Sequence, residues 1–166
     1  MNRTHAYYHR RAAEILQRIQ YATLATVTED GRPWNSPVYA LHDEQGRIYW
    51  VSDKLGQHSR NVRHNGQVFI VIYDSTVPEG DGEGLYLQAK AYQLEDPDEI
   101  RKVRRLKKGS KADDPTPFMG KGVRRVYQAV PQAAWMNDAQ VENGKFIRDY
   151  RVRLSLPEIR RQLKKG

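Results

Sequence analysis

The chain has 166 residues, of which 39% are hydrophobic and 29% charged, and this balance excludes a disordered protein. It contains no cysteine, which excludes disulfides, thiolate catalysis and cysteine-based zinc sites. The formal net charge of +8 indicates an anionic ligand or partner. The length predicts one domain, residues 1–166. Because no apolar stretch reaches the roughly 20 residues of a membrane span, and the N-terminus lacks a signal-peptide core, we expect a cytoplasmic protein without a membrane partner.

The first part of the chain is typical of a helix followed by an antiparallel meander. A narrow apolar stripe, with Thr4 as a capping residue, predicts a helix over residues 4–20. Strands are expected at residues 21–27, 34–41 and 47–52. Pro37 cannot donate to a β-ladder, so the second of these strands should lie at a sheet edge or contain a bulge.

A short helix is expected next, between a cap at Ser52 or Asp53 and a left-handed stop at Asn65-Gly66. A buried strand at 68–73 follows. The segment 74–84 is rich in glycine and acidic residues and is expected to be a loop that serves as a lid or entrance to a site.

The second part of the chain repeats this mixture of strands and helices. Asp96-Pro97 is a strong helix start, and that helix should run to about Lys108 and end at Gly109. A polar loop over 110–120 should follow it. Strands are expected at residues 85–94, 123–130, 133–137 and 145–154, and a last basic helix at Pro157. Six or more mostly antiparallel strands with hairpins tend to close into a barrel.

The order and spacing of several segments resemble the pyridoxamine 5′-phosphate oxidase-like FMN-binding split-barrel family, over residues 12–131. These segments are Tyr21–Val27, Glu29–Pro33, Ser36–Tyr39, Ile48–Ser52, His58–Asn65, Val68–Ile70 and Gln88–Ala91. The resemblance implies a mainly β (α+β) fold, a six-stranded antiparallel split β-barrel of Greek-key type with peripheral helices. It also implies a homodimer that binds FMN at the subunit interface.

The resemblance further implies which residues hold the cofactor. The cofactor-binding residues are expected to be Asn35, Ser36, Pro37, Val38, Trp50, Val51, Ser52, His58, Ser59, Arg60 and Trp135. Ser52, His58 and Ser59 would hold the phosphate, with help from a helix N-terminus and nearby cations. Each residue also has a plainer interpretation: Arg60 as a solvated helix residue, and Trp50 and Trp135 as packing residues.

The chain departs from typical members of that family at three places. Ser36 and Leu41 stand where they carry Arg and Lys, and Gln57 and His58 stand where they carry an Arg-Lys pair. The Arg-x-His triplet that binds the vitamin phosphate is absent from 145–155. The first two changes weaken the phosphate site, for which Arg32, Arg47 or Arg60 are the replacement candidates. The third removes the support for a vitamin B6 substrate.

Three functions compete at this stage. The first is an FMN-dependent oxidoreductase acting on an unidentified small molecule, in which no acid–base side chain is indispensable. The second is a binding protein that holds flavin, F420 or haem without turnover. The third is nucleic-acid binding by the helix at 101–111. Its basic residues surround it and are not interleaved with aromatic residues, so this hypothesis is disfavoured.

Overall fold

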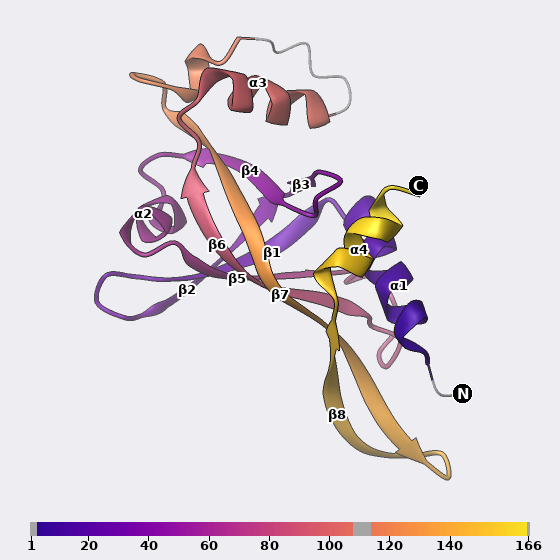
Figure 1. Cartoon of the computed structure of the whole chain (residues 1–166). Coiled ribbons are helices and arrows are strands. Elements are labelled where there is room, and N and C mark those ends of the chain that lie inside the picture. Colours follow the sequence, from indigo (N-terminus) through magenta and orange to yellow (C-terminus); the bar gives the residue numbers. More distant parts are fainter. Residues whose placement is uncertain (1–2, 108–113, 166) are drawn as a thin grey trace.

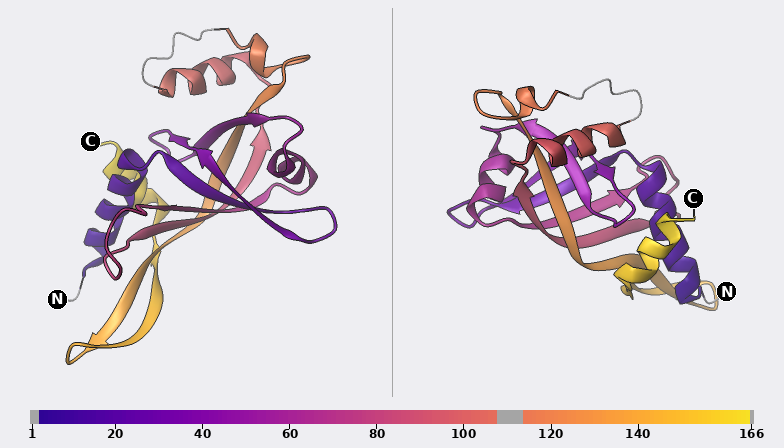
Figure 2. Two further views of the ribbon diagram at one scale, coloured as in Figure 1. Left: turned by 180° about the vertical axis from the view of Figure 1, so that it is seen from behind. Right: turned by 45° about the horizontal axis from the view of Figure 1, so that its top comes forward.

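The computed structural model describes residues 3–107 and 114–165. A curved antiparallel sheet forms the body of the molecule, with α1 and α4 packed side by side at one end and α3 at the top of the view in Figure 1, next to β3 (Figure 1, Figure 2). The elements are α1 (His5–Arg18), β1 (Tyr21–Val27), β2 (Pro33–Tyr39), β3 (Leu41–His42), β4 (Ile48–Asp53), α2 (Gln57–His64), β5 (Gln67–Tyr73), β6 (Gly84–Gln93), α3 (Pro97–Leu106), the 3-10 turn η1 (Thr116–Phe118), β7 (Arg124–Glu142), β8 (Lys145–Leu154) and α4 (Leu156–Leu163).

The sheet has eight strands in the order β2-β1-β5-β6-β7-β4-β3, with β8 paired to β7. Every pairing is antiparallel. Without the two-residue β3 and the projecting β8, the six strands of the expected split barrel remain, so the predicted α+β fold class is confirmed with two additional strands. The sheet does not close, because β2 and β4 touch without pairing in the described part of the chain. β2 is an edge strand, as Pro37 predicts.

The core lies inside this curved sheet. Alternate residues of β5, Val68, Ile70 and Ile72, are buried, which is the period expected of a strand with one face toward the core. A second apolar cluster joins α3 and η1 to the outer side of β4 and β7, through residues such as Ile100 and Phe118. Each fully buried side chain of this size stabilises the fold by about 1.5–3 kcal/mol.

The structure corrects the prediction of two strands at 123–130 and 133–137, because β7 is one continuous strand of 19 residues. Pro131 lies opposite Ala89, where the register shifts between Gln88 and Ala89. A bulge tolerates a residue that lacks an N–H donor, so the proline does not end the strand. β7 is long because its second edge pairs first with β4 and then with β8.

The start of α2 is a second correction. Neither Ser52 nor Asp53 caps the helix, because β4 continues through both and Gly56 is the N-cap. Asp53 instead organises the turn between β4 and α2. Its side chain accepts a hydrogen bond from the N–H of Leu55, and its carbonyl accepts one from the N–H of Gly56. Gly66 adopts the expected left-handed conformation, with φ +67°.

The helix ends otherwise follow the sequence signals. Thr4 caps α1 by accepting from the N–H of Tyr7, and Asp96 caps α3 by accepting from the N–H groups of Asp98 and Glu99. The predicted stop at Gly109 and part of the 110–120 loop lie outside the described residues. None of the described helices has the length and apolarity needed to cross a bilayer.

Candidate functional site

The split in the barrel exposes two backbone edges to each other. β2 pairs only with β1, and β3 covers β4 only at Tyr49 and Ile48, so Trp50–Asp53 and Asn35–Val38 each have one edge without a strand partner among the described strands. β2 and β4 are in contact across this gap. Unpaired backbone N–H and C=O groups on a strand edge are ready to bind a planar polar ligand.

The N-terminus of α2 lies beside this split, because β4 leads into it through a short turn (Figure 1). Its cap, Gly56, offers no side-chain acceptor. The first N–H groups of the helix therefore have no intrahelical or side-chain acceptor and carry the positive end of the helix dipole. Such a terminus is suited to an anion such as a phosphate.

Two of the predicted phosphate residues meet at this place. Nε2 of His58 and the hydroxyl of Ser52 lie 2.8 Å apart and share a hydrogen bond. Burial lowers the pKa of the His58 imidazole, so at neutral pH this residue is an uncharged hydrogen-bonding group. Ser59 is fully buried and its hydroxyl donates to the carbonyl of Asp53 at 2.7 Å. Its side chain therefore holds the turn, and only its backbone N–H remains for a ligand.

Of the three arginines considered as replacements, two lie near the split. The Arg60 guanidinium lies across the first turn of α2, donating to the carbonyl of Leu55 and to Oε1 of Gln57. Arg32 lines a groove that also includes Gln57. Arg47 is bound to Asp43 through two nitrogens at 2.6 Å and contributes nothing there.

That groove, of about 670 Å³, is the part of the site that the sequence did not reveal. It lies between the β1–β2 turn and the start of α2, and its lining consists of Thr28, Glu29, Asp30, Arg32, Pro33, Trp34 and Gln57. The Trp34 indole is 46% exposed and its N–H donates to the hydroxyl of Ser36 at 3.1 Å. A half-exposed tryptophan in an edge strand is the one signal that could have indicated this surface.

Asn61 is a second residue that the sequence analysis missed. Its amide is buried, donates to the hydroxyl of Thr26 at 2.9 Å and accepts from the amide of Gln57 at 2.8 Å. These bonds tie α2 to β1 and orient Gln57 toward the groove. A buried amide is retained only when it is satisfied, so Asn61 positions the site.

The predicted aromatic contacts are not all brought together. Trp50 is 1% exposed, stacks on Tyr127 within the core, and has an indole N–H without an acceptor in the described structure. Only its backbone, with that of the half-buried Val51, borders the split. Trp135 lies beyond the stretch of β7 that pairs with β4, on the outer face, where it stacks on Phe69. Within one chain it does not reach Ser52 or His58.

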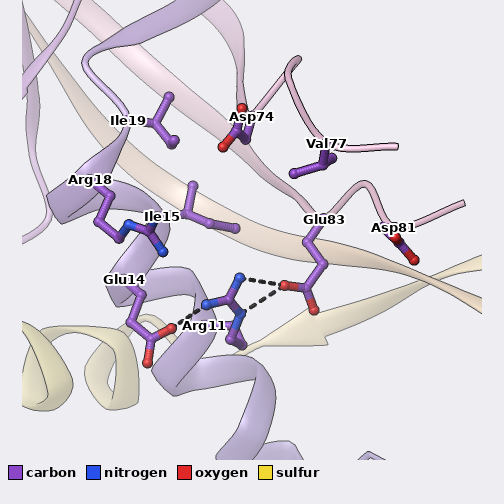
Figure 3. A pocket seen from close by; sticks show the side chains of 9 residues that line it. All are labelled: Arg11, Glu14, Ile15, Arg18, Ile19, Asp74, Val77, Asp81 and Glu83. Atoms are coloured by element: carbon purple, nitrogen blue, oxygen red, sulfur yellow. Dashed lines mark hydrogen bonds and ion pairs between the residues drawn. The ribbon is translucent and has the colours of Figure 1, made fainter. Parts of the chain in front are cut away.

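The acidic segment 74–83 does not border the split within one chain. It connects the ends of β5 and β6 that lie away from α2, and Glu83 pairs with Arg11 of α1, with Nη2 and Oε2 2.7 Å apart (Figure 3). Tyr7 also donates to Glu83, at 2.6 Å. A pocket of about 140 Å³ with mixed charges lies between this segment and α1. The structure gives no support within a single chain for a lid over the split.

An open antiparallel barrel with an uncapped helix start at its seam has the architecture of the split-barrel class of proteins. The sequence profile of pyridoxamine 5′-phosphate oxidase matches residues 9–137. The chain therefore belongs to the pyridoxamine 5′-phosphate oxidase family. A search of curated protein sequences gives no match.

Solved structures with the same fold include two proteins that are named for haem and one named for the pyridoxinephosphate oxidase family. A haem-binding protein from Mycobacterium smegmatis has a TM-score of 0.68 at 18% identity, over 97% of this chain and 62% of that one. A Clostridium acetobutylicum protein of the pyridoxinephosphate oxidase family, related to general stress protein 26, has a TM-score of 0.61 at 13% identity, over 93% and 98%. The haem storage protein HutZ from Vibrio cholerae has a TM-score of 0.56 at 20% identity, over 75% and 90%. This chain spans less than two thirds of the mycobacterial protein's length.

Proposed function

We propose that this chain is an FMN-dependent oxidoreductase that binds the cofactor in the split between β2 and β4 and acts on a small molecule as a homodimer. The observation that carries the proposal is the uncapped start of α2 beside two unpaired strand edges. A phosphorylated, flat, polar-edged cofactor needs these two features together. Bound FMN would supply the electron transfer, and the protein the slot, the orientation and the exclusion of water.

Each group of the chain has a distinct part in this proposal. The N–H groups of α2, the Ser52–His58 pair and Arg60 hold the phosphate. The backbone of Asn35–Val38 and Trp50–Val51 borders the ring. Because Trp135 lies outside the split of its own chain, its proposed contact is with the flavin of the second copy in the homodimer. We also propose a cytoplasmic location.

The phosphate contact can be separated from the ring contact by comparing FMN with riboflavin. Wild-type protein should bind FMN, measured by quenching of flavin fluorescence, about tenfold or more tightly than riboflavin, because charge-assisted bonds to the phosphate are lost. The R60Q variant should weaken FMN binding by a similar factor and leave riboflavin binding unchanged. R18Q removes an exposed charge from the end of α1 and is the matched control. Equal affinity of wild-type protein for both flavins would refute the phosphate site.

Haem storage or transport without turnover is the second candidate, favoured by the names of two proteins of the same fold. The same split would receive the porphyrin, with the half-buried His58, bonded to Ser52, as the candidate imidazole ligand. The cofactor that co-purifies decides between the two: an FMN spectrum supports the first candidate, and a haem spectrum the second. A flavin that a reduced nicotinamide bleaches supports turnover over binding alone.

A further inference from the structure

Three arginines gather where α3, η1 and β7 meet, at the end of the molecule that carries α3 (Figure 1). The guanidinium carbon of Arg104, on α3, lies 4.8 Å from the centre of the Phe118 ring, and that of Arg124, at the start of β7, lies 5.5 Å from it. Arg125, the next residue of β7, is buried. None of the three forms an ion pair with a carboxylate of the described residues. We call these three residues the arginine cluster.

Arg104 is a half-buried cation whose charge is not compensated. In the described part of the chain its guanidinium forms no hydrogen bond and no ion pair, and its Nε is buried without an acceptor. Burial lowers the pKa of this guanidinium, and the charge of Arg124 lowers it further. Burial of an unpaired charge and the proximity of two like charges are both unfavourable. The contact with the Phe118 ring offsets only part of this cost, because a ring attracts a cation weakly.

The carboxylates that the chain places near the cluster do not supply the missing charge. Asp53 lies opposite Arg124 in the ladder of β4 and β7, but its side chain accepts from the N–H of Leu55. Asp114 lies just before η1 and accepts from the N–H of Thr116. Neither carboxylate forms an ion pair with the cluster within the described structure. The local excess of positive charge is therefore suited to an anion from outside the chain.

A pocket of about 270 Å³ opens beside the same aromatic ring. Its lining includes Gln93, Leu94, Glu95, Phe118, Met119 and Arg125. The Arg125 guanidinium donates to the carbonyls of Gly120 at 2.6 Å and of Gly122 and Arg124 at 2.7 Å, and so holds the turn that leads into β7. The pocket therefore combines a cation, an apolar wall and two polar side chains.

We propose that the arginine cluster binds the phosphate group of a small molecule, whose remaining part lies in this pocket. The guanidinium groups of Arg104 and Arg124 suit a phosphate because each can donate two parallel hydrogen bonds. Leu94 and Met119 contact carbon atoms of the ligand, and the carboxylate of Glu95 accepts from a hydroxyl group. A polynucleotide needs cations along an extended groove, whereas these lie at one point. The site shares no residue with the proposed cofactor site and goes beyond the proposed function.

Titration with inorganic phosphate, followed by two-dimensional NMR of the backbone amides, tests the site. At an ionic strength held constant with chloride, phosphate should shift the amide signals of residues 118–125 with a dissociation constant of about 1 mM or lower. The R104M variant keeps an unbranched stem against Phe118 but loses the charge, and its dissociation constant should be about tenfold higher or more. The R104K variant keeps the charge and should retain most of the affinity.

Ribose 5-phosphate tests the pocket in the same way. The wild-type chain should bind it more tightly than inorganic phosphate, because its hydroxyl groups reach Glu95. The E95Q variant should remove this advantage without weakening the binding of inorganic phosphate, since it takes away a negative charge near the anion. Equal affinity of the wild-type chain for the two compounds overturns the pocket as part of the site.

R148Q is the matched control for the loss of one positive charge, because Arg148 is exposed on β8 and bonds to Gln140 beside it. Its affinity for phosphate should equal that of the wild-type chain, and the NMR spectra show whether each variant is folded. An equal loss of affinity in R104M and R148Q overturns the site. Binding of a single-stranded oligonucleotide without binding of phosphate overturns it as well.

The site at the arginine cluster and the proposed cofactor site can be tested separately. R104M should bind FMN as tightly as the wild-type chain does, and R60Q should keep the phosphate-induced shifts at residues 118–125. Shifts confined to the start of α2 would overturn the cluster as a phosphate site and leave the cofactor site standing. Shifts at residues 118–125 in a chain that takes up no FMN would support the cluster and refute the proposed function.

Discussion

His9 is a buried titratable residue on the barrel side of α1. It is 8% exposed, and its Nε2 accepts from the N–H of Ser155, the N-cap of α4, at 3.0 Å. This bond requires an unprotonated Nε2. Burial lowers the pKa of His9, an effect opposed by the nearby Glu158 and reinforced by His5. His5, one turn earlier on α1, is exposed and its ring stacks on that of His9.

The sign of the pH effect follows from this lowered pKa. Below about pH 6.5, the ordinary histidine value, the unfolded chain takes up a proton that the folded chain refuses, so stability is lost as the pH falls. We expect the thermal midpoint of cofactor-free protein to drop between pH 7.5 and pH 5.5, and His9 should account for part of this drop. The H9Q variant keeps a hydrogen-bond acceptor for the N–H of Ser155, and its thermal midpoint should fall less steeply with pH.

His58, whose pKa burial also lowers, should contribute to the same pH dependence. The thermal midpoint of H9Q/H58Q should therefore depend less on pH than that of either single variant. H64Q, at the exposed end of α2, is the control and should retain the wild-type profile. An unchanged slope in H9Q would show that His9 does not couple α1 to α4 in this way.

At the scale of elements, the junction between α2 and β5 is the most constrained turn near the site. Gly66 has a φ of +67°, and a Cβ there would lie 2.6 Å from the carbonyl oxygen of Ala91, a backbone atom. The carbonyl of Gly66 also accepts from the N–H of Ala91 at 2.8 Å. A methyl group would push β6 from α2 and loosen the helix whose N-terminus faces the split.

G66A should therefore lower the free energy of unfolding by about 2–4 kcal/mol, the left-handed backbone and the steric overlap both contributing. G31A is a matched control, because Gly31 has a φ of +83° but no atom within 4 Å of an added Cβ. The G31A variant should lose only about 1 kcal/mol of unfolding free energy, the cost of the left-handed backbone alone. Urea unfolding measures both, and equal losses would mean that the contact with Ala91 is not limiting.

The sequence predicted the elements whose signals are local. The continuous apolar run at residues 68–72 and the cap at Asp96 were sufficient for β5 and α3. The sequence-based prediction failed where the structure depends on pairing between distant segments. Pro131 interrupts the pattern of strand-forming residues, but it lies at a bulge in the pairing of β6 with β7, so the strand continues. The site divides in the same way. Ser52 and His58 were proposed from the resemblance to a known family and lie within one short segment, whereas the approach of Trp34 to Gln57 depends on how a hairpin meets a helix.

At the scale of the whole molecule, the proposed cofactor split belongs to one open sheet. β7 connects the split to the rest of that sheet, because it pairs with β4 near the split and with β8 beyond it. A ligand that binds only the folded chain stabilises all of these elements together. The thermal midpoint is therefore a readout of which cofactor the split accepts.

At a ligand concentration about 100 times the dissociation constant, the stabilisation is about 2.7 kcal/mol. For a chain of this size that raises the thermal midpoint by roughly 5–10 °C. We expect FMN to produce this shift, riboflavin a smaller one, and haem or F420 none if the split is shaped for FMN. R60Q should abolish the difference between FMN and riboflavin, because the added stability comes from the phosphate at the start of α2. If haem alone raises the thermal midpoint, the haem-binding candidate replaces the FMN-dependent oxidoreductase as the proposed function, while the fold and the split stay as described.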